Sequence, residues 1–357
     1  MKKKVGVFLF SFLLFGAALG LVAYMLSRQF LFQGSEPQGR DVIYEIRQGQ
    51  NFHAIARDLQ KMRVLKSAEA FAVYARLTRQ IPNVKAGEYR FNTAMTPPEV
   101  MAVMTSGQSV TRSITIPEGY SVFEIADLLE SKGFAKREEI LRLAFDRAFV
   151  KKLLGEYYSS LEGYLYPETY SFTKYMGPEK ILSEMVRLFF VNFEQVPKPF
   201  PFSWNRHQVV TMASLIEKET GAPHERQLIS SVFTNRLRKN MRLQTDPTII
   251  YAKALQVGRI VIDIRKSDLT MNHPYNTYMK SGLPPGPIAS PGKDALRAAV
   301  NPAISDFLFF VSQNDGTHIF SETYEKHANA VRRFQMDRRA REGKSWRDLN
   351  KATEGRP

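Results

Sequence analysis

The sequence contains no cysteine among its 357 residues, which excludes disulfide bridges, thiolate metal sites and a cysteine nucleophile. It has only six histidines, and no two of them have the three- or four-residue spacing that places metal ligands on one helix face. A G-x-S-x-G elbow and a Walker-type glycine loop are also absent. Composition alone does not exclude a Ser-His-Asp triad. The absences favour carboxylate chemistry, with no metal and no cofactor.

The N-terminus predicts export. Residues 5–26 carry no charge and follow Lys2, Lys3 and Lys4, and a helix of this length spans a bilayer core of about 30 Å. The lysines favour a cytoplasmic tail at 1–4 and a single-pass anchor in the plasma (inner) membrane. A cleaved signal peptide with a site near Ala18 is the alternative, but the apolar run continues to Leu26. Either way, we expect the body of the chain outside the cytoplasm.

The chain is basic, with a formal net charge of +15. An exported protein does not meet nucleic acid, so anionic lipid headgroups or an acidic wall polymer are the partners that this charge favours. A solvated basic surface is the simpler interpretation. Part of the excess lies in a C-terminal tail at 336–357, which we expect to be a solvated helix and a frayed end.

A polar linker at 27–40 is followed by an internal repeat. Residues 44–71 align with 113–140, and each copy predicts a strand, a glycine turn at Gly49 or Gly119, and two helices. A strand at 84–91 and a helix at 96–107 complete the first copy. The segment 41–112 thereby resembles a LysM domain, a βααβ module that binds N-acetylglucosamine polymers. A spacer without binding activity is the alternative.

The second copy and a connecting segment occupy 113–200. Within it, "LEGYLYPETY" (161–170) places aromatic rings beside carboxylates, as sugar sites do, although a core strand with a turn has the same composition.

A Pro-rich stretch at 196–205 marks the start of a last domain, 201–335. There, the loop 282–292 is rich in Pro and Gly and predicts either a rigid cleft wall or a rigid connector. Residues 307–312 and 316–323 predict a hairpin. The fold class is therefore α+β.

Two acids interrupt a helix that otherwise reads as buried, in "ASLIEKET" (213–220). On a helical wheel, Glu217 and Glu219 lie at opposite boundaries of the apolar face, and Lys218 points away from it. A carboxyl beside apolar neighbours has a raised pKa, which suits a general acid. Rim salt bridges are the alternative. Periodicity does not choose between the two acids.

Four segments together closely resemble the endolytic murein transglycosylase (YceG-like) family. They are "LEGYLYPETY", "SLIEKETGAPHER", "NRLRKNMRLQTDPTIIYA" and "YNTYMKSGLPPGPIASPG". The resemblance implies cleavage of the MurNAc–GlcNAc β-1,4 linkage within peptidoglycan strands, with 1,6-anhydro-MurNAc ends, and termination of nascent strands. It implies that the first Glu of the E-K-E motif, Glu217, is catalytic, and that synthases are possible partners. The polar residues of these motifs are our candidates for sugar contacts: Glu162, Gln244, Asp246, Asn276 and Tyr278.

Two other functions fit the sequence. A muramidase that admits water needs a second catalytic carboxylate, for which Glu219 or Glu162 is available. A non-catalytic scaffold that binds the wall and recruits synthases needs none. The new chain ends in digested peptidoglycan distinguish the three, because they are anhydro ends, reducing ends or absent.

Overall fold

The computed structural model describes residues 30–336 without a break and, before them, residues 15, 16, 18, 20, 21, 25 and 28. The predicted membrane segment 5–26 lies largely outside the described residues, and so does the predicted tail 336–357 except for its first residue. No helix in the described part of the chain is both long and apolar enough to cross a membrane.

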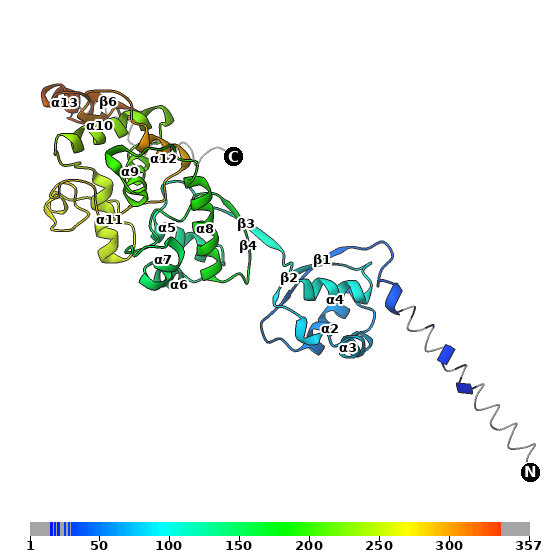
Figure 1. Ribbon diagram of the computed structural model, residues 1–357. Coiled ribbons are helices and arrows are strands. Elements are labelled where there is room, and N and C mark those ends of the chain that lie inside the picture. The colour runs from blue at the N-terminus through cyan, green and yellow to red at the C-terminus, as the bar shows by residue number, and fades with distance from the viewer. Residues whose placement is uncertain are drawn as a thin grey trace, which may run out of the picture. The chain divides into compact units, whose positions relative to one another are not determined.

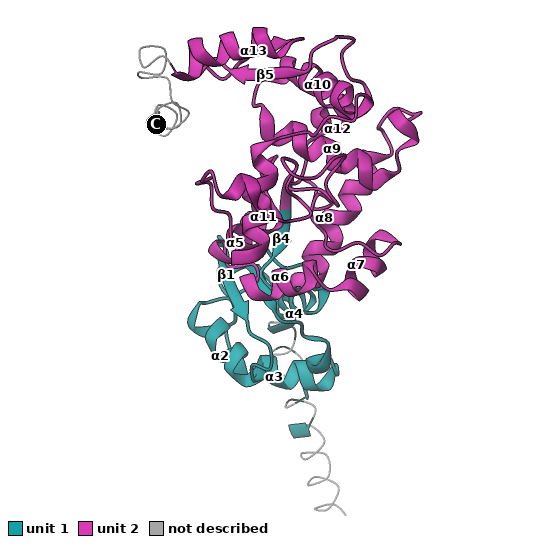
Figure 2. Cartoon of the chain, turned by 90° about the vertical axis from the view of Figure 1, so that its left-hand side faces the viewer, with its two compact units in different colours: residues 1–112, 171–175 teal, residues 113–170, 176–357 magenta. Residues whose placement is uncertain are grey.

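The chain forms two compact units (Figures 1 and 2). Unit 1 comprises Met1–Arg112 and Ser171–Tyr175, and unit 2 comprises Ser113–Tyr170 and Met176–Pro357. The boundary that the sequence predicts at 200 therefore falls inside unit 2.

Unit 1 has the predicted strand, helix, helix, strand order. Its elements are β1 (Asp41–Ile46), α2 (Phe52–Lys61), α3 (Ala68–Leu77), the 3₁₀ turn η1 (Ile81–Asn83), β2 (Gly87–Asn92) and α4 (Pro97–Ser106). The strands pair antiparallel, with Tyr44 opposite Tyr89, and the helices cover them around a buried core. Pro97 starts α4, and Gly107, with a φ of 74°, ends it, as predicted. The likeness of residues 41–112 to a LysM domain and their binding of glycan both stay predictions.

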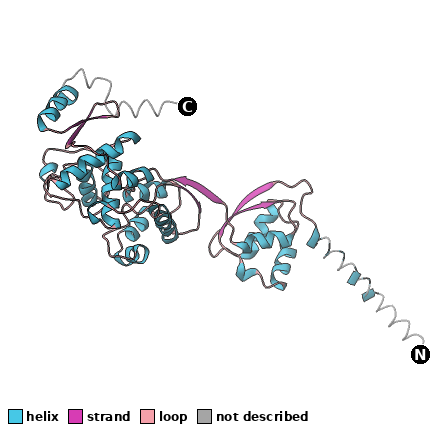
Figure 3. Cartoon of the chain, turned by 45° about the horizontal axis from the view of Figure 1, so that its top comes forward, coloured by secondary structure: helices cyan, strands magenta, loops and turns pink. Residues whose placement is uncertain are grey.

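Helices are the main regular elements of unit 2 in the described part of the chain (Figure 3). The first part contains β3 (Thr111–Thr115), α5 (Val122–Ser131), α6 (Arg137–Ala144), α7 (Arg147–Leu154), β4 (Thr169–Thr173) and α8 (Pro178–Phe193). The middle contains η2 (Pro201–Ser203), α9 (Arg206–Glu219), η3 (Pro223–Glu225), α10 (Arg226–Arg238), α11 (Asp246–Val257) and η4 (Asp268–Thr270). The last part contains α12 (Lys293–Val300), β5 (Phe309–Ser312), β6 (His318–Ser321), α13 (Tyr324–Val331) and η5 (Arg332–Met336). Strands β3 and β4 form a small sheet whose residues are divided between the units. The α+β class is confirmed.

The internal repeat is structural. Gly49 and Gly119 both have a left-handed backbone, with φ values of 74° and 75°. After α2, the Val64 N–H donates to the Leu59 carbonyl, and after α5 the Phe134 N–H donates to the Leu129 carbonyl. Each copy thus closes its first helix with the same turn, so the two copies share one supersecondary unit although they belong to different compact units.

Helix α9 is central to unit 2 (Figure 1): α10, α11 and α12 pack against it. Asn205 caps its N-terminus in a capping box with Gln208. Every residue from 209 to 216 is buried. The acids follow directly after this buried stretch, in the last turn of the helix.

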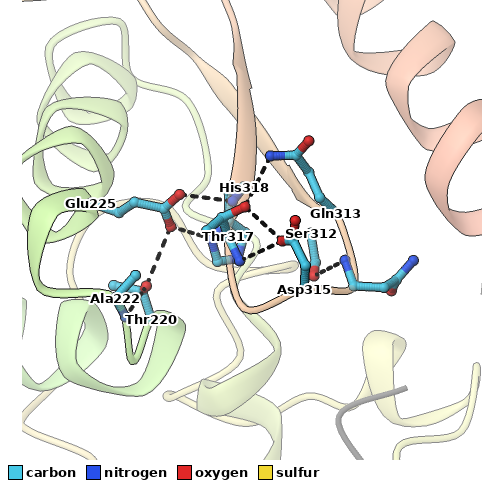
Figure 4. Close-up of polar contacts among 9 residues, drawn as sticks. Thr220, Ala222, Glu225, Ser312, Gln313, Asp315, Thr317 and His318 are labelled. Carbon is cyan, nitrogen blue, oxygen red and sulfur yellow. Dashed lines mark hydrogen bonds and ion pairs between the residues drawn. The ribbon is translucent and has the colours of Figure 1, made fainter. Parts of the chain in front are cut away.

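The predicted C-terminal hairpin is present, with Ser312 opposite His318 in the antiparallel pair β5–β6. Figure 4 shows how it is joined to the turn after α9. The buried Glu225 accepts a hydrogen bond from the His318 N–H (2.8 Å), and its other oxygen lies 2.7 Å from His318 Nδ1. Thr220 also donates to this carboxylate. The hairpin is thereby fixed beside the end of α9.

Candidate active site

The two acids of α9 lie on opposite sides of the helix end, as the wheel predicts. The side chains of Glu217 and Glu219 are largely buried, whereas Lys218 is exposed and donates through Nζ to the Gly119 carbonyl (3.0 Å). Glu217 and Glu219 contact different groups, so each acid has its own hydrogen-bond partners and its own electrostatic environment.

Glu217 is held through both of its carboxylate oxygens. Arg226 Nη2 lies 3.3 Å from Oε1, and the Gly292 N–H donates to Oε2 at 2.9 Å. The side chains of Glu217 and Arg226 are only 6% and 9% exposed. Gly292 is the N-cap of α12, so the partial positive charge of that helix end also faces the carboxylate. A buried anion in this place is paired and hydrogen-bonded, as a buried charge must be.

A second carboxylate, Glu118, lies at the same arginine. Its Oε2 is 3.8 Å from Arg226 Nη2, and its side chain is 51% exposed. Burial raises the pKa of Glu118, and the negative charge of Glu217 raises it further, while Arg226 acts in the opposite direction. Glu118 is therefore the solvent-facing member of a pair of carboxylates that share one guanidinium.

Backbone hydrogen bonds join the turn of Glu118 to the proline-rich loop. The Gly119 N–H donates to the Ser290 carbonyl (2.9 Å), and the Ser290 N–H donates to the Tyr120 carbonyl (2.8 Å). Farther back in the same loop, the Ile288 N–H donates to the Ser214 hydroxyl on α9 (3.1 Å). The loop is largely buried from Gly286 to Gly292. The loop carries the Gly292 N–H that holds Glu217, and both predicted interpretations, a rigid cleft wall and a rigid connector, are compatible with this contact.

Glu219 faces a different pocket, of about 370 Å³. Burial raises the pKa of Glu219 to about 7; a hydrogen bond from the Thr245 hydroxyl counteracts the shift, and the charge of Asp246 adds to it. The pocket is lined by polar and aromatic side chains: Glu219, Arg236, Leu243, Gln244, Asp246, Tyr278, Phe309, Phe310, Tyr324 and His327. Glu217 is not among its lining residues.

Three of the five predicted sugar contacts meet in this pocket of Glu219. Gln244 and Asp246 are exposed, and the Tyr278 hydroxyl donates to Asp246 Oδ1 at 2.6 Å. Gln244 has a left-handed backbone, with a φ of 50°, a conformation that costs a non-glycine residue free energy and that clusters at functional sites. The structure thus groups these residues, but around Glu219 and not around Glu217.

The other two predicted contacts, Glu162 and Asn276, are inside the fold. The Glu162 side chain accepts the Val122 N–H (3.0 Å), and burial raises its pKa to about 8. The Asn276 amide donates to the Met271 carbonyl (2.7 Å). Glu162 is 1% exposed and Asn276 is fully buried. A direct sugar contact by either would require these bonds to break.

The aromatic segment around Glu162 is also buried. Leu161, Tyr164 and Leu165 have no exposed surface, and the Tyr164 hydroxyl lies 2.9 Å from His207 Nδ1 on α9. Gly163 needs its lack of a side chain, because a Cβ there would lie 2.4 Å from Pro287. Of the two interpretations of "LEGYLYPETY", the core segment is the one that the structure shows.

Sequence reasoning missed Glu118 and Arg226. Arg226 is the last residue of the segment "SLIEKETGAPHER", nine residues after Glu217, but nothing in the composition marks it as a contact of that acid. Glu118 lies outside the four segments and far from Glu217 in the sequence. One signal was available: in the repeat alignment Glu118 stands where the first copy has Gln48. No group of three His, Asp or Glu side chains that could hold a metal ion occurs within the described ranges.

Comparisons with known proteins agree on one family. A model of the YceG-like family matches residues 44–333. An endolytic murein transglycosylase of Bacillus subtilis (strain 168) is 30% identical over 87% of this chain and 90% of its own length. One from Streptococcus pneumoniae (strain D39) is 28% identical over 92% of this chain, which spans 65% of that protein. A crystal structure of a yceG-like protein from Listeria monocytogenes is 33% identical, with a TM-score of 0.54, over 81% of this chain and 98% of that one.

Proposed function

The chain belongs to the YceG-like family and is an endolytic murein transglycosylase; within this activity, we propose that Glu217 is the catalytic acid and base. The observation that carries the proposal is the setting of Glu217. It is the acid of the E-K-E motif that the rigid Pro-Gly loop contacts, through the Gly292 N–H. Such a fixed carboxylate meets the first requirement of general acid–base catalysis, which is geometry.

One carboxyl is sufficient for the reaction. The protonated Glu217 gives its proton to the glycosidic oxygen while the bond from that oxygen to C1 of the muramic sugar breaks. The resulting carboxylate then takes the proton of the sugar's own C6 hydroxyl while O6 bonds to C1. The products are a 1,6-anhydro end and a free hydroxyl on the departing sugar, and no water is consumed. The 3.3 Å contact with Arg226 is long for a charged hydrogen bond, so Oε1 is the oxygen more easily freed for this work.

We assign glycan binding to the pocket of Glu219. Its aromatic rings offer faces on which sugar C–H surfaces stack, and Gln244, Asp246 and Tyr278 offer hydroxyl partners beside them. Because Glu217 is not in its lining, this pocket binds a sugar other than the one whose bond is cleaved.

We also propose that residues 5–26 anchor the chain in the plasma (inner) membrane with unit 2 outside the cytoplasm. The support is the uncharged run behind three lysines. An anchor would restrict the enzyme to newly made strands near the membrane, where synthases work.

The test is Glu217→Gln, which keeps the volume of the side chain but removes its proton. Loss of general acid–base catalysis typically costs about 10²–10⁴ in rate, so anhydro ends should disappear from digested sacculi in mass spectra while the fold is retained. Glu219→Gln should still form anhydro ends, no more than about tenfold more slowly. A folded Glu217→Gln enzyme with substantial turnover would refute the assignment, and an inactive Glu219→Gln enzyme would transfer it to Glu219.

A further inference from the structure

A second pocket, of about 260 Å³, lies at the end of α9 on the side of Lys218. Isoleucines from α11, from the segment after it and from the proline-rich loop form much of its wall: Ile250, Ile260, Ile262 and Ile288. We propose that this pocket, the stem pocket, binds the first residues of the peptide stem that is attached to the lactyl group of the muramic sugar. The inference rests on the proposed role of Glu217, because Glu217 acts at C1 of that same sugar.

The stem pocket is next to the proposed catalytic carboxyl. A Cβ built on Gly119 would lie 3.6 Å from Glu217 Cγ and 3.8 Å from Lys218 Cδ, so both side chains lie against this glycine. Lys218 lines the pocket, and so does Ser121, which follows Gly119 on the same turn. The lactyl group leaves the muramic ring at C3. A sugar whose C1 reaches Glu217 therefore has its peptide stem within reach of the pocket.

The wall of the stem pocket is apolar although the pocket is open to solvent. Ile262 is 60% exposed at its edge, Ile250 and Ile260 are half-buried, and Ile288 is buried. A single exposed apolar side chain is ordinary, but several around one concave site form a surface that a ligand covers. The alanine at the start of a peptide stem has a methyl group that suits such a wall.

The polar groups of the stem pocket match a peptide. Lys218 is bound through Nζ to the neutral Gly119 carbonyl and forms no ion pair within residues 30–336, so its charge is available for a carboxylate of the stem. Glu124 also lines the pocket. Its Oε2 accepts the N–H and the hydroxyl of Ser121 (both 2.8 Å), and its other oxygen is an acceptor for a peptide N–H.

The stem pocket differs from the pocket of Glu219 in a way that separates peptide from sugar. The pocket of Glu219 presents the rings of Phe309, Phe310 and Tyr324, and sugars stack on such faces. In the stem pocket the aromatic side chain is Tyr251, which is only 2% exposed. Branched aliphatic side chains with one cation suit small apolar groups and a carboxylate, which the stem carries and a glycan ring of N-acetylglucosamine does not.

The wall formed by the segment after α11 is held in place. Arg137 Nη2 donates to the Gly258 carbonyl before the two isoleucines of this segment. Directly after them, Lys253 Nζ donates to the Asp263 carbonyl (2.6 Å). The isoleucines are thus fixed on both sides, so the stem pocket is formed before a ligand arrives, as binding sites usually are.

The experiment compares two substrates, un-cross-linked glycan strands that carry peptide stems and the same strands after an amidase has removed the stems. The ratio of the two kcat/KM values for anhydro-end formation measures the preference for stems. The original enzyme should prefer stem-bearing strands about tenfold, the low end of what one methyl-sized group in an apolar pocket discriminates. Ile262→Asp should lower the ratio to about one, because its charge repels both methyl groups and carboxylates. Ile304→Asp, at a fully exposed isoleucine outside the pocket, is the matched control and should keep the ratio.

A second variant tests the charge of the stem pocket. Lys218→Gln should lower the preference for stems about threefold, as expected for an exposed ion pair. High salt should lower the preference of the original enzyme and leave that of Lys218→Gln unchanged, because salt screens the pairing of Lys218 with the stem. Lys180→Gln, at an exposed lysine on α8, is the control.

Equal kcat/KM values of the original enzyme on the two kinds of strand would overturn the proposal. So would an equal loss on both in Ile262→Asp, because that is what a sugar subsite or a merely structural role gives. Glu217→Gln is measured in parallel, so that two failures stay distinct. If it is inactive and the original enzyme shows no preference for stems, only the stem pocket is refuted. If it remains active, the role of Glu217 is refuted, while a ratio that still falls in Ile262→Asp supports the stem pocket independently.

Discussion

Glu162 should make the stability of unit 2 depend on pH. Its carboxyl is 1% exposed and its pKa is raised to about 8, mainly by burial, against 4.5 for an ordinary Glu. The folded state therefore binds more protons than the unfolded state between these values, and stability falls as pH rises. The contribution is fully present below about pH 4.5 and is lost as pH rises through about 8.

The magnitude follows from linkage. With these two pKa values, the carboxyl lowers the free energy of unfolding by about 3 kcal/mol between pH 5 and pH 8. Glu162→Gln removes the titration but keeps a carbonyl oxygen to accept the Val122 N–H. The stability of the variant relative to the original protein should therefore improve by about 3 kcal/mol over that range.

Urea unfolding followed by tryptophan fluorescence measures this difference. Residues 1–112 and 171–175, which form unit 1, contain no tryptophan, and Trp204 is buried in unit 2. Unfolding of unit 1 therefore does not contribute to the signal. Glu168→Gln, an exposed acid in the same segment, should show no such trend. A difference between Glu162→Gln and the original protein that stays constant from pH 5 to pH 8 would refute the reasoning, since it would mean that Glu162 does not titrate with a raised pKa.

Two further predictions concern the anchor and the glycan pocket. Removal of residues 1–27 should leave cleavage of purified sacculi intact, because every residue of the proposed site lies beyond residue 117. A folded but inactive fragment would show that residues 1–27 do more than tether the enzyme. Tyr278→Ala should raise KM for glycan strands about tenfold with little change in kcat. Tyr278→Phe keeps the ring and loses only the hydroxyl bond to Asp246, so it should raise KM less. An equal loss of kcat in both variants would argue that the pocket takes part in chemistry.

Local signals in the sequence predicted individual elements of both units. The prolines at the start of α4, the turn residues between β5 and β6 and the apolar residues of α9 each specify a conformation within a few residues. The helical wheel also placed Glu217 and Glu219 at the two boundaries of the buried face, which the structure confirms. A wheel gives no information on what packs against each side.

The contacts that distinguish the two acids join distant parts of the chain. Gly292 is 75 residues from Glu217, and no hydrophobic periodicity or motif spacing in the sequence predicts a contact between them. The same limitation applies to Glu162: an acid among aromatic rings suits both a sugar site and a core, and only its hydrogen bond with Val122, 40 residues away, shows which one it occupies. Gln244, Asp246 and Tyr278 line one pocket, but it is the pocket of Glu219, and their sugar contacts stay a prediction.

The position of the acids on α9 explains why a buried helix carries them at all. Both stand in its last turn, where the buried stretch from 209 to 216 ends. The C-terminal end of a helix disfavours negative charge by about 0.3–1 kcal/mol, so an acid there tends to keep its proton unless other groups compensate. At Glu217, Arg226 and the Gly292 N–H at the start of α12 contact the two carboxylate oxygens. At Glu219, the neighbouring charge of Asp246 adds to the effect of burial, and the carboxyl favours its neutral form in a pocket suited to binding.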